Sequence, residues 1–292
     1  MYELQGKQAV WQIDTDSVEI RFHTDRRSDP FFRALSHLRV PVPFISSVQV
    51  SSGGRREGWR MQLTLLPGLD PFATVGAALS ASKQPFLLVG EPGSDQLLAQ
   101  FHADAIMQAA EFARSEAKPS GERIVELVPR IPFHIQTWEG AASCDANSVT
   151  LTWPGARIPS PKRLHQRREF ALDSIARAEW VPRDDGVDAF LRIVLKDRPS
   201  EGISPRNDLH CLLGHDGEDE ARLLLMAATI TAHCRGMQEA APAPTSPASA
   251  GTGSVDSEQI YERIRQLGKL HAEGILTDEE FAAKKKELLD RL

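Results

Sequence analysis

Cysteine is scarce in this sequence, and long apolar runs are absent. The three cysteines among 292 residues are an odd and sparse set, unlike the disulfide framework of a small secreted domain. The longest nearly unbroken apolar stretch, residues 223–230, is far shorter than the ~18–20 residues that span a bilayer. Acidic residues interrupt the first twenty positions, which have no apolar core, so we expect no signal peptide. These absences together predict a reduced, cytoplasmic protein.

The short motifs of common catalytic sites are also missing. Neither a phosphate-binding glycine loop after a strand nor a G-x-S-x-G nucleophile turn occurs. Ser80 and Lys83 have the S-x-x-K spacing of serine acyltransferases, but the companion K-T-G motif is absent. His210 and Cys211 do not have a recognised zinc-ligand spacing, and the other histidines are scattered. We therefore expect no catalytic residue, no metal and no cofactor, and hypothesise that the protein is not an enzyme.

An excess of basic charge is absent as well. The chain has 34 Lys and Arg against 40 Asp and Glu, for a net charge of −6. This balance disfavours sequence-independent binding of nucleic acid, which depends on Lys and Arg against phosphates. Hydrophobic residues make up 41% and charged residues 25% of the chain, as in ordinary globular proteins.

A stretch made almost wholly of Ala, Pro, Ser, Thr and Gly, residues 240–254, divides the chain near its end. Such a composition cannot bury a core, so it predicts a flexible linker. In residues 255–292, apolar side chains recur at helical spacing on both sides of Gly274, and Thr277 with Glu280 forms a capping box. The pattern predicts a hairpin of two short helices. The apolar positions that we expect to bury in self-association or against a partner are Ile260, Ile264, Leu267, Leu270, Phe281, Leu288 and Leu289.

This hairpin resembles a SHOCT (short C-terminal) domain. The likeness spans about 30 residues from Ile264, with the Gly274-Ile275-Leu276-Thr277 turn and a lysine-rich second helix that ends in Leu288-Leu289. The resemblance implies a role in oligomerisation or contact with a partner. It implies no catalytic residues.

The region before the linker is duplicated. Residues 14–18 match residues 145–149, and each set lies between alternating apolar runs typical of a β-hairpin. Further on, the apolar spacing of residues 42–50 matches that of residues 172–180, at a similar offset of about 130 residues. A repeat of this length indicates two copies of one domain, because solenoid repeats have periods of only ~20–50 residues.

Each copy is predicted to contain six or seven short strands followed by one amphipathic helix. The helices are expected over about Asp95–Arg114 and Glu218–Cys234. The apolar positions of the first helix are Phe101, Ala105, Ile106, Ala109 and Phe112.

This order of elements resembles a PH-like domain. With the hairpin, the chain resembles an uncharacterised bacterial family of tandem PH-like domains of unknown function that ends in SHOCT. The likeness rests on three features that follow one another in the family's order. They are the Trp11–Val18 hairpin, the Pro41-Val42-Pro43 segment that precedes a predicted strand, and the terminal helix. It implies an α+β fold in which each copy is a strongly bent antiparallel β-barrel or sheet capped by a C-terminal helix. The expected domains are residues 1–118 and 119–239, both PH-like, then the linker 240–254 and the hairpin 255–292.

Two further features bear on binding. Lys162, Arg163, Arg167 and Arg168 form the densest basic cluster, which predicts contact with phosphate on a lipid headgroup or a nucleic acid. The alternative is a solvated polar loop. Five tryptophans lie in or beside strands, and we expect Trp59 and Trp180 to fill the two cores rather than to bind a ligand.

The leading hypothesis is a binding or scaffold protein that oligomerises through its hairpin, with itself or another protein as partner. The linker would let several PH-like domains cluster and gain avidity. The first alternative is a peripheral membrane protein that binds anionic lipid through the basic cluster. Nucleic-acid binding and catalysis are the remaining, less favoured alternatives.

Overall fold

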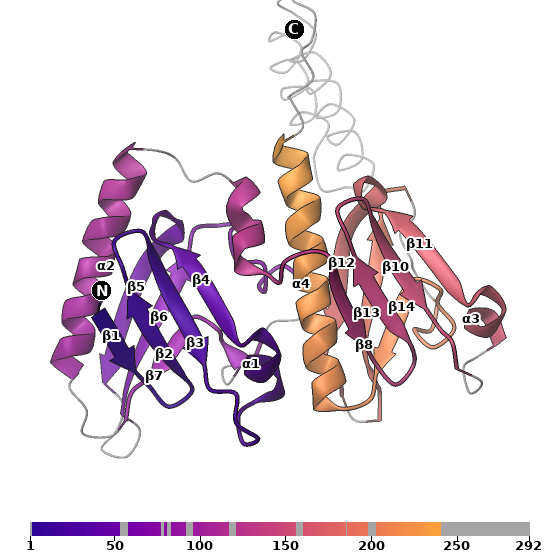
Figure 1. Cartoon of the computed structure of the whole chain (residues 1–292), viewed down its shortest axis with the longest axis horizontal. Helices are drawn as coiled ribbons and strands as arrows, with labels where there is room; N and C mark the ends of the chain where they lie inside the picture. Colours follow the sequence, from indigo (N-terminus) through magenta and orange to yellow (C-terminus); the bar gives the residue numbers. More distant parts are fainter. Residues whose placement is uncertain are drawn as a thin grey trace, which may run out of the picture. The chain divides into compact units, whose positions relative to one another are not determined.

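The first half of the chain builds two antiparallel sheets and two helices (Figure 1). One sheet has the order β1-β2-β3-β4, and the other has the order β5-β6-β7. Helix α1 joins β3 to β4, and α2 follows β7. The bounds are β1 Tyr2–Gln5, β2 Ala9–Ile13, β3 Ser17–Phe22, α1 Pro30–Leu35, β4 His37–Pro41, β5 Ile45–Ser52, β6 Trp59–Leu65, β7 Leu87–Val89 and α2 Gln96–Glu116.

The second half repeats this order of elements. Its sheets have the orders β11-β10-β9-β8 and β12-β13-β14, α3 joins β10 to β11, and α4 follows β14. The bounds are β8 Phe133–Gln136, β9 Ala141–Cys144, β10 Ser148–Thr152, α3 Ser160–His165, β11 Arg167–Ala171, β12 Ile175–Val181, β13 Ala189–Leu195, β14 Cys211–Gly214 and α4 Gly217–Ala240. A 3₁₀ helix, η3 (Gly121–Leu127), lies between the halves.

This computed structural model describes residues 2–52, 58–76, 79–80, 83–91, 96–116, 121–155, 160–184, 186–197 and 203–240. The chain divides into two units, Met1–Ala241 and Pro242–Leu292, and every described residue lies in the first. The predicted linker, apart from Ala240, and the predicted hairpin with its seven apolar positions therefore lie outside the described residues.

Local details confirm the duplication. Ser36 and Gln166, the residues that follow α1 and α3, are non-glycine residues with positive φ, 57° and 55°. The carbonyl of Ser36 accepts from Phe22 N–H and that of Gln166 accepts from Trp153 N–H, both at 2.8 Å. The β-bulge between Ile45 and Ser47 recurs between Ile175 and Arg177. Each copy therefore has seven strands and a terminal helix in the part of the chain that the structure describes, as the sequence predicts.

The sheets of each copy do not close into a barrel, at least among the described strands, which corrects one form of the fold expected from the sequence. In the first copy the ladder of β4 ends at Pro41, and the chain passes through the 3₁₀ turn η1 (Val42–Phe44) into β5 of the other sheet. Proline has no N–H with which to extend a ladder. The second copy turns at η4 (Leu172–Ser174) in the same way.

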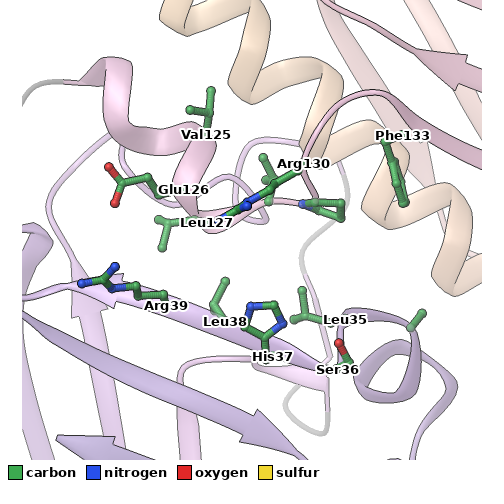
Figure 2. A pocket seen from close by; sticks show the side chains of 13 residues that line it. Leu35, Ser36, His37, Leu38, Arg39, Val125, Glu126, Leu127, Arg130 and Phe133 are labelled. Atoms are coloured by element: carbon green, nitrogen blue, oxygen red, sulfur yellow. The ribbon is translucent and has the colours of Figure 1, made fainter.

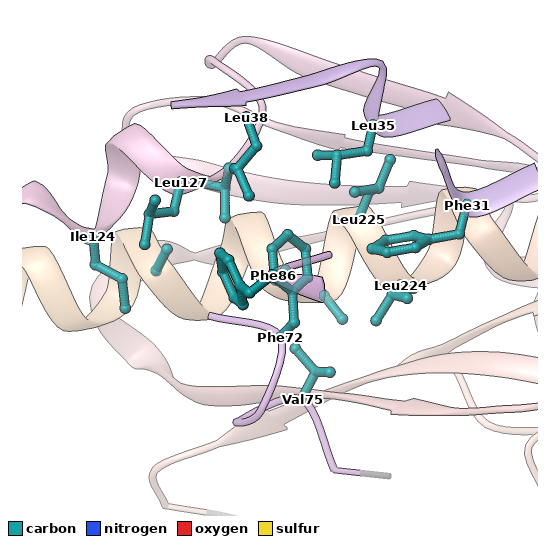
Figure 3. Packing of buried hydrophobic residues seen from close by; sticks show 14 of the residues in the cluster. Phe31, Leu35, Leu38, Phe72, Val75, Phe86, Ile124, Leu127, Leu224 and Leu225 are labelled. Atoms are coloured by element: carbon teal, nitrogen blue, oxygen red, sulfur yellow. The ribbon is translucent and has the colours of Figure 1, made fainter. Parts of the chain in front are cut away.

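Helix α4 is the element that joins the two copies. It packs on β12 and β13 of its own copy and on α1 and η3 of the other side (Figure 1). Figure 3 shows Phe31 and Leu35 of α1 close to Leu224 and Leu225 of α4, and all four side chains are buried. One hydrophobic cluster includes residues of both copies, so the copies share a core. The sequence division at residue 118 stays a prediction.

Helix α2 differs from α4 in having only one buried side. Its buried positions are Ala99, His102, Ala103, Ile106 and Ala110. Phe101 and Phe112, which belong to its apolar pattern in the sequence, are 57% and 65% exposed. Trp59 and Trp180 are buried as predicted.

We predict that truncation of Leu225 to alanine destabilises both copies together. Leu225 is buried where α4 meets α1, so the cavity should cost about 2–5 kcal/mol of unfolding free energy. Because the core is shared, urea unfolding followed by tryptophan fluorescence should remain a single transition. Leu164→Ala, at an exposed position on α3, should change stability by less than about 0.5 kcal/mol. Two separate transitions would contradict a shared core.

Candidate functional site

Strand β4 is at the edge of its sheet, and its unpaired side opens onto a groove. Phe22 N–H donates to Ser36 O, and Val42 N–H donates to Asp16 O. In the antiparallel register of β3 and β4, every second pair of opposite residues exchanges backbone hydrogen bonds. These two bonds show that Leu38 and Val40 belong to such pairs, so their backbone groups bond to β3. The backbone groups of His37 and Arg39 therefore face away from β3, toward the groove. The part of β4 that could pair with a further strand ends at Pro41, because proline has no backbone N–H to donate.

The groove has a volume of about 950 Å³ and runs between β4 and the segment from η3 to β8 (Figure 2). Leu38 and Leu127 are buried beneath it, and half-buried Val125 and Phe133 give its far wall an apolar surface. Arg39 and Glu126 reach toward one another at one end in Figure 2, and Arg130 crosses the middle. Arg39 and Arg130 outnumber Glu126, so the rim is more cationic than anionic.

A second groove, of about 660 Å³, continues from the first through Ala34 and Phe133, which line both. It follows β8, the edge strand of the second copy. Trp138, 48% exposed, lies at its end, where its backbone N–H donates to Asp219 Oδ2 at 3.1 Å. The carboxylate of Asp219 thus accepts from one outward-facing backbone N–H at the end of β8. In β4, by contrast, the outward backbone groups of His37 and Arg39 face the groove.

The structure divides the predicted basic cluster. Lys162 is fully buried on α3, and its ammonium donates to Glu139 Oε1 and Oε2 at 2.8 and 2.9 Å. Burial lowers the pKa of Lys162 and raises the pKa of Glu139, and the attraction between the two opposes both shifts. The prediction of a phosphate contact is corrected for Lys162, because its charge is enclosed and already neutralised.

The first copy fills the same place without charge. Gln8, equivalent to Glu139, accepts from Val89 N–H at 3.2 Å and donates to Leu87 O at 2.5 Å. Glu139 likewise accepts from Leu213 N–H, at 2.9 Å. Phe32, equivalent to Lys162, stacks on Phe22 with ring centroids 4.7 Å apart. In the second copy the Lys162 ammonium lies 5.6 Å from the ring centroid of Trp153. The Glu139–Lys162 ion pair thus stands where the first copy has the neutral Gln8 and the stacked rings of Phe22 and Phe32.

Comparison with known families agrees with this duplicated architecture. Residues 11–107 and 142–231 match the domain of unknown function DUF4429, so two stretches cover more than half of the chain. The chain belongs to the DUF4429 family. Residues 262–289 match the Short C-terminal domain, SHOCT, as the resemblance in the sequence implied. No match was found among curated proteins.

The other basic residues of the second DUF4429 copy remain near the surface. Arg163 and Arg167 are exposed, and Arg168 is half-buried with its guanidinium 5.3 Å from the Phe170 ring centroid. Arg167 pairs with Glu169 at 2.9 Å. Without Lys162, and with Glu169 among them, these three arginines form a weaker anion-binding cluster than the sequence predicts.

The thiols of this DUF4429 chain are poorly suited to nucleophilic chemistry. Burial raises the pKa of Cys144 and of Cys211 to about 12 and that of Cys234 to about 11, so all three stay protonated at neutral pH. Within the described residues, no cluster of three His, Cys, Asp or Glu side chains is arranged to hold a metal. The Lys83 ammonium pairs with Glu220 at 2.7 Å. Among the helices described, none combines the length and apolar character needed to cross a membrane.

Two features of this region were missed from the sequence. Helix α1 begins at an Asp29 N-cap, whose Oδ1 accepts from Phe31 N–H at 2.8 Å, with Pro30 at the first helical position. The Asp-Pro pair before α1, and Ser160-Pro161 at the start of α3, are recognisable helix-start signals. The groove itself has no such signal, because its walls come from segments about ninety residues apart.

We predict strong coupling between Glu139 and Lys162. Lys162→Met alone leaves a buried carboxylate unpaired and should cost about 3–5 kcal/mol of unfolding free energy. The double variant Glu139→Gln/Lys162→Met should recover most of that loss, because the first copy is stable with glutamine and an apolar residue at these places. Urea midpoints of the single and double variants measure the coupling. Additive losses would show that the pair does not act as a unit.

Proposed function

We propose that this DUF4429 protein is a non-enzymatic binding and scaffold protein. One extended segment of a partner protein adds to the free edge of β4, and the C-terminal hairpin gathers several copies of the chain. The observation that carries the proposal is the outward-facing backbone of His37 and Arg39 along a groove of about 950 Å³. Edge strands that face a groove bind extended peptides through main-chain hydrogen bonds.

The groove's side chains favour a particular kind of segment. Backbone pairing with His37 and Arg39 requires N–H groups on the peptide, which excludes proline at the paired positions. The cationic rim of Arg39 and Arg130 favours an acidic residue, and the half-buried Val125 and Phe133 favour an apolar one. We therefore propose a short extended segment that carries a carboxylate beside an apolar side chain.

The SHOCT match supports the oligomerisation part of the proposal. Burial of the apolar faces of the hairpin, at roughly 25 cal/mol per Å², would oppose the entropy lost on assembly. Several tethered grooves then bind a repetitive or multimeric partner with greater avidity than one groove does.

The oligomerisation proposal predicts that Phe281→Asp lowers the mass of the full chain in solution. Phe281 lies within the SHOCT match, and a charge there would oppose burial of the apolar face. Light scattering after gel filtration measures the mass. Ala283→Asp is the matched control, because at 3.6 residues per turn position 283 lies opposite the apolar stripe of the predicted helix. Equal masses for the parent chain and Phe281→Asp would contradict the proposal.

The groove proposal predicts that Ala34→Trp abolishes peptide binding. Ala34 is exposed where the two grooves meet, so an indole there should occupy the space. The probe is a set of acidic 12-residue peptides selected from a random displayed library on the full chain. Binding should protect the His37 and Arg39 amides from hydrogen exchange, and the control Ile203→Trp, at an exposed position outside the grooves, should bind normally.

Peptides that bind Ala34→Trp as tightly as the parent chain would overturn this assignment. So would peptides that leave the exchange of both amides unchanged. A library that yields no binder at millimolar peptide would do the same.

A further inference from the structure

Beside its packing on η3, α4 contacts the first copy through one short helix and complementary charge. Phe31 and Leu35 of α1 meet Leu224 and Leu225 of α4 (Figure 3). At its edge Arg33 of α1 donates to Glu218 Oε1 of α4 at 3.1 Å. Cationic groups from the first copy thus meet carboxylates on the terminal helix of the second, and Lys83 with Glu220 repeats this polarity.

Helix α2 holds the same place in the first copy, but the described residues cover it on one side only. It packs on β5 and η1, as α4 packs on β12 and η4. Its outer face carries Leu97, 81% exposed, together with Phe101 and Phe112. Asp104 and Glu111 are exposed on the same face, because all five positions fall within about a third of the helix circumference at 3.6 residues per turn. This outer α2 face is therefore apolar and acidic.

The opposite end of the tandem offers the matching surface. Helix α3 is the counterpart of α1, and Arg163 holds the place of Arg33 as the fourth residue of a six-residue helix. The next residue, Leu164, is 82% exposed. His165 and Arg167 beside it are also exposed. This outer α3 face is apolar and cationic, although Leu164 holds the place of Ala34, an exposed residue of α1, and not that of the buried Phe31 and Leu35 that meet α4.

We propose that the outer α2 face of one chain docks on the outer α3 face of a second copy. The contact between chains pairs a terminal helix with the short helix of a second copy, and it keeps the charge polarity of the contact between α4 and α1. The two faces lie on different copies of the repeat and are not alike, so the association is head-to-tail. Such a contact extends to further copies unless its geometry closes a ring. It requires no hairpin, so it is separable from the oligomerisation proposed for the SHOCT domain.

The test uses full-length chains that carry Phe281→Asp, so that association through the hairpin is suppressed. Sedimentation velocity over a range of concentrations should show a mass that rises with concentration. Phe101→Asp and Leu164→Asp should each remain monomeric. An equimolar mixture of these two variants should form a 1:1 dimer, since each supplies the face that the other lacks. Both positions are exposed, so circular dichroism should show an unchanged fold.

A matched control and a salt series complete the test. Ile203→Asp places the same charge on an exposed apolar residue outside both faces and should associate like its parent. Association should weaken between 50 mM and 500 mM salt, because the faces carry opposite charges.

Three outcomes would overturn the proposal. The first is a parent chain that stays monomeric up to about 1 mM, a concentration at which a micromolar contact is saturated. The second is a mixture of Phe101→Asp and Leu164→Asp that forms no dimer. The third is an effect of Phe101→Asp that appears only with an intact hairpin, which would mean that the α2 face binds the hairpin of the chain itself.

Discussion

The burial of α4 on two sides is the constraint on which the rest of this structure depends. A helix that ends a domain normally needs one apolar face, since its other face meets water. Here the side chains from Ala221 to Cys234 are almost all buried, because β12 and β13 cover one side while α1 and η3 cover the other. The two DUF4429 copies consequently share one core.

The shared helix also determines where the grooves lie. Segment 121–133 must cross from the end of α2 to β8 while η3 packs on α4. That path takes it alongside β4 without hydrogen-bonded pairing among the described residues, which leaves the outward side of His37 and Arg39 facing a gap. The exposed edge of β4 is thus a consequence of how the copies are joined, and among the described residues no segment of a following repeat runs beside its counterpart β11.

The two copies have diverged by exchanging whole groups of interacting residues. Gln8, Phe22 and Phe32 form a neutral cluster in the first copy, and Glu139, Trp153 and Lys162 take their places in the second. A single replacement would leave a buried charge unpaired, so the residues can change only together. This position is buried in both copies, as Phe32 and as Lys162, so the exposed arginines and Leu164 determine the outward character of α3.

Much of the fold was determined by the sequence alone. Alternating apolar residues, hairpin turns and the internal repeat predicted six or seven strands and a terminal helix in each copy, and each copy has seven strands, because strand and helix periodicities are local properties. The SHOCT match was likewise readable from a contiguous run of residues. Tertiary structure alone decided which apolar and charged side chains are covered. Phe101 and Phe112 are exposed although they fit the helical pattern, and Lys162 is buried although it lies in a basic run. The burial of these side chains depends on which distant segment of the chain packs beside them, and the groove along β4 depends on this too. Local periodicity in the sequence does not determine which distant segments meet.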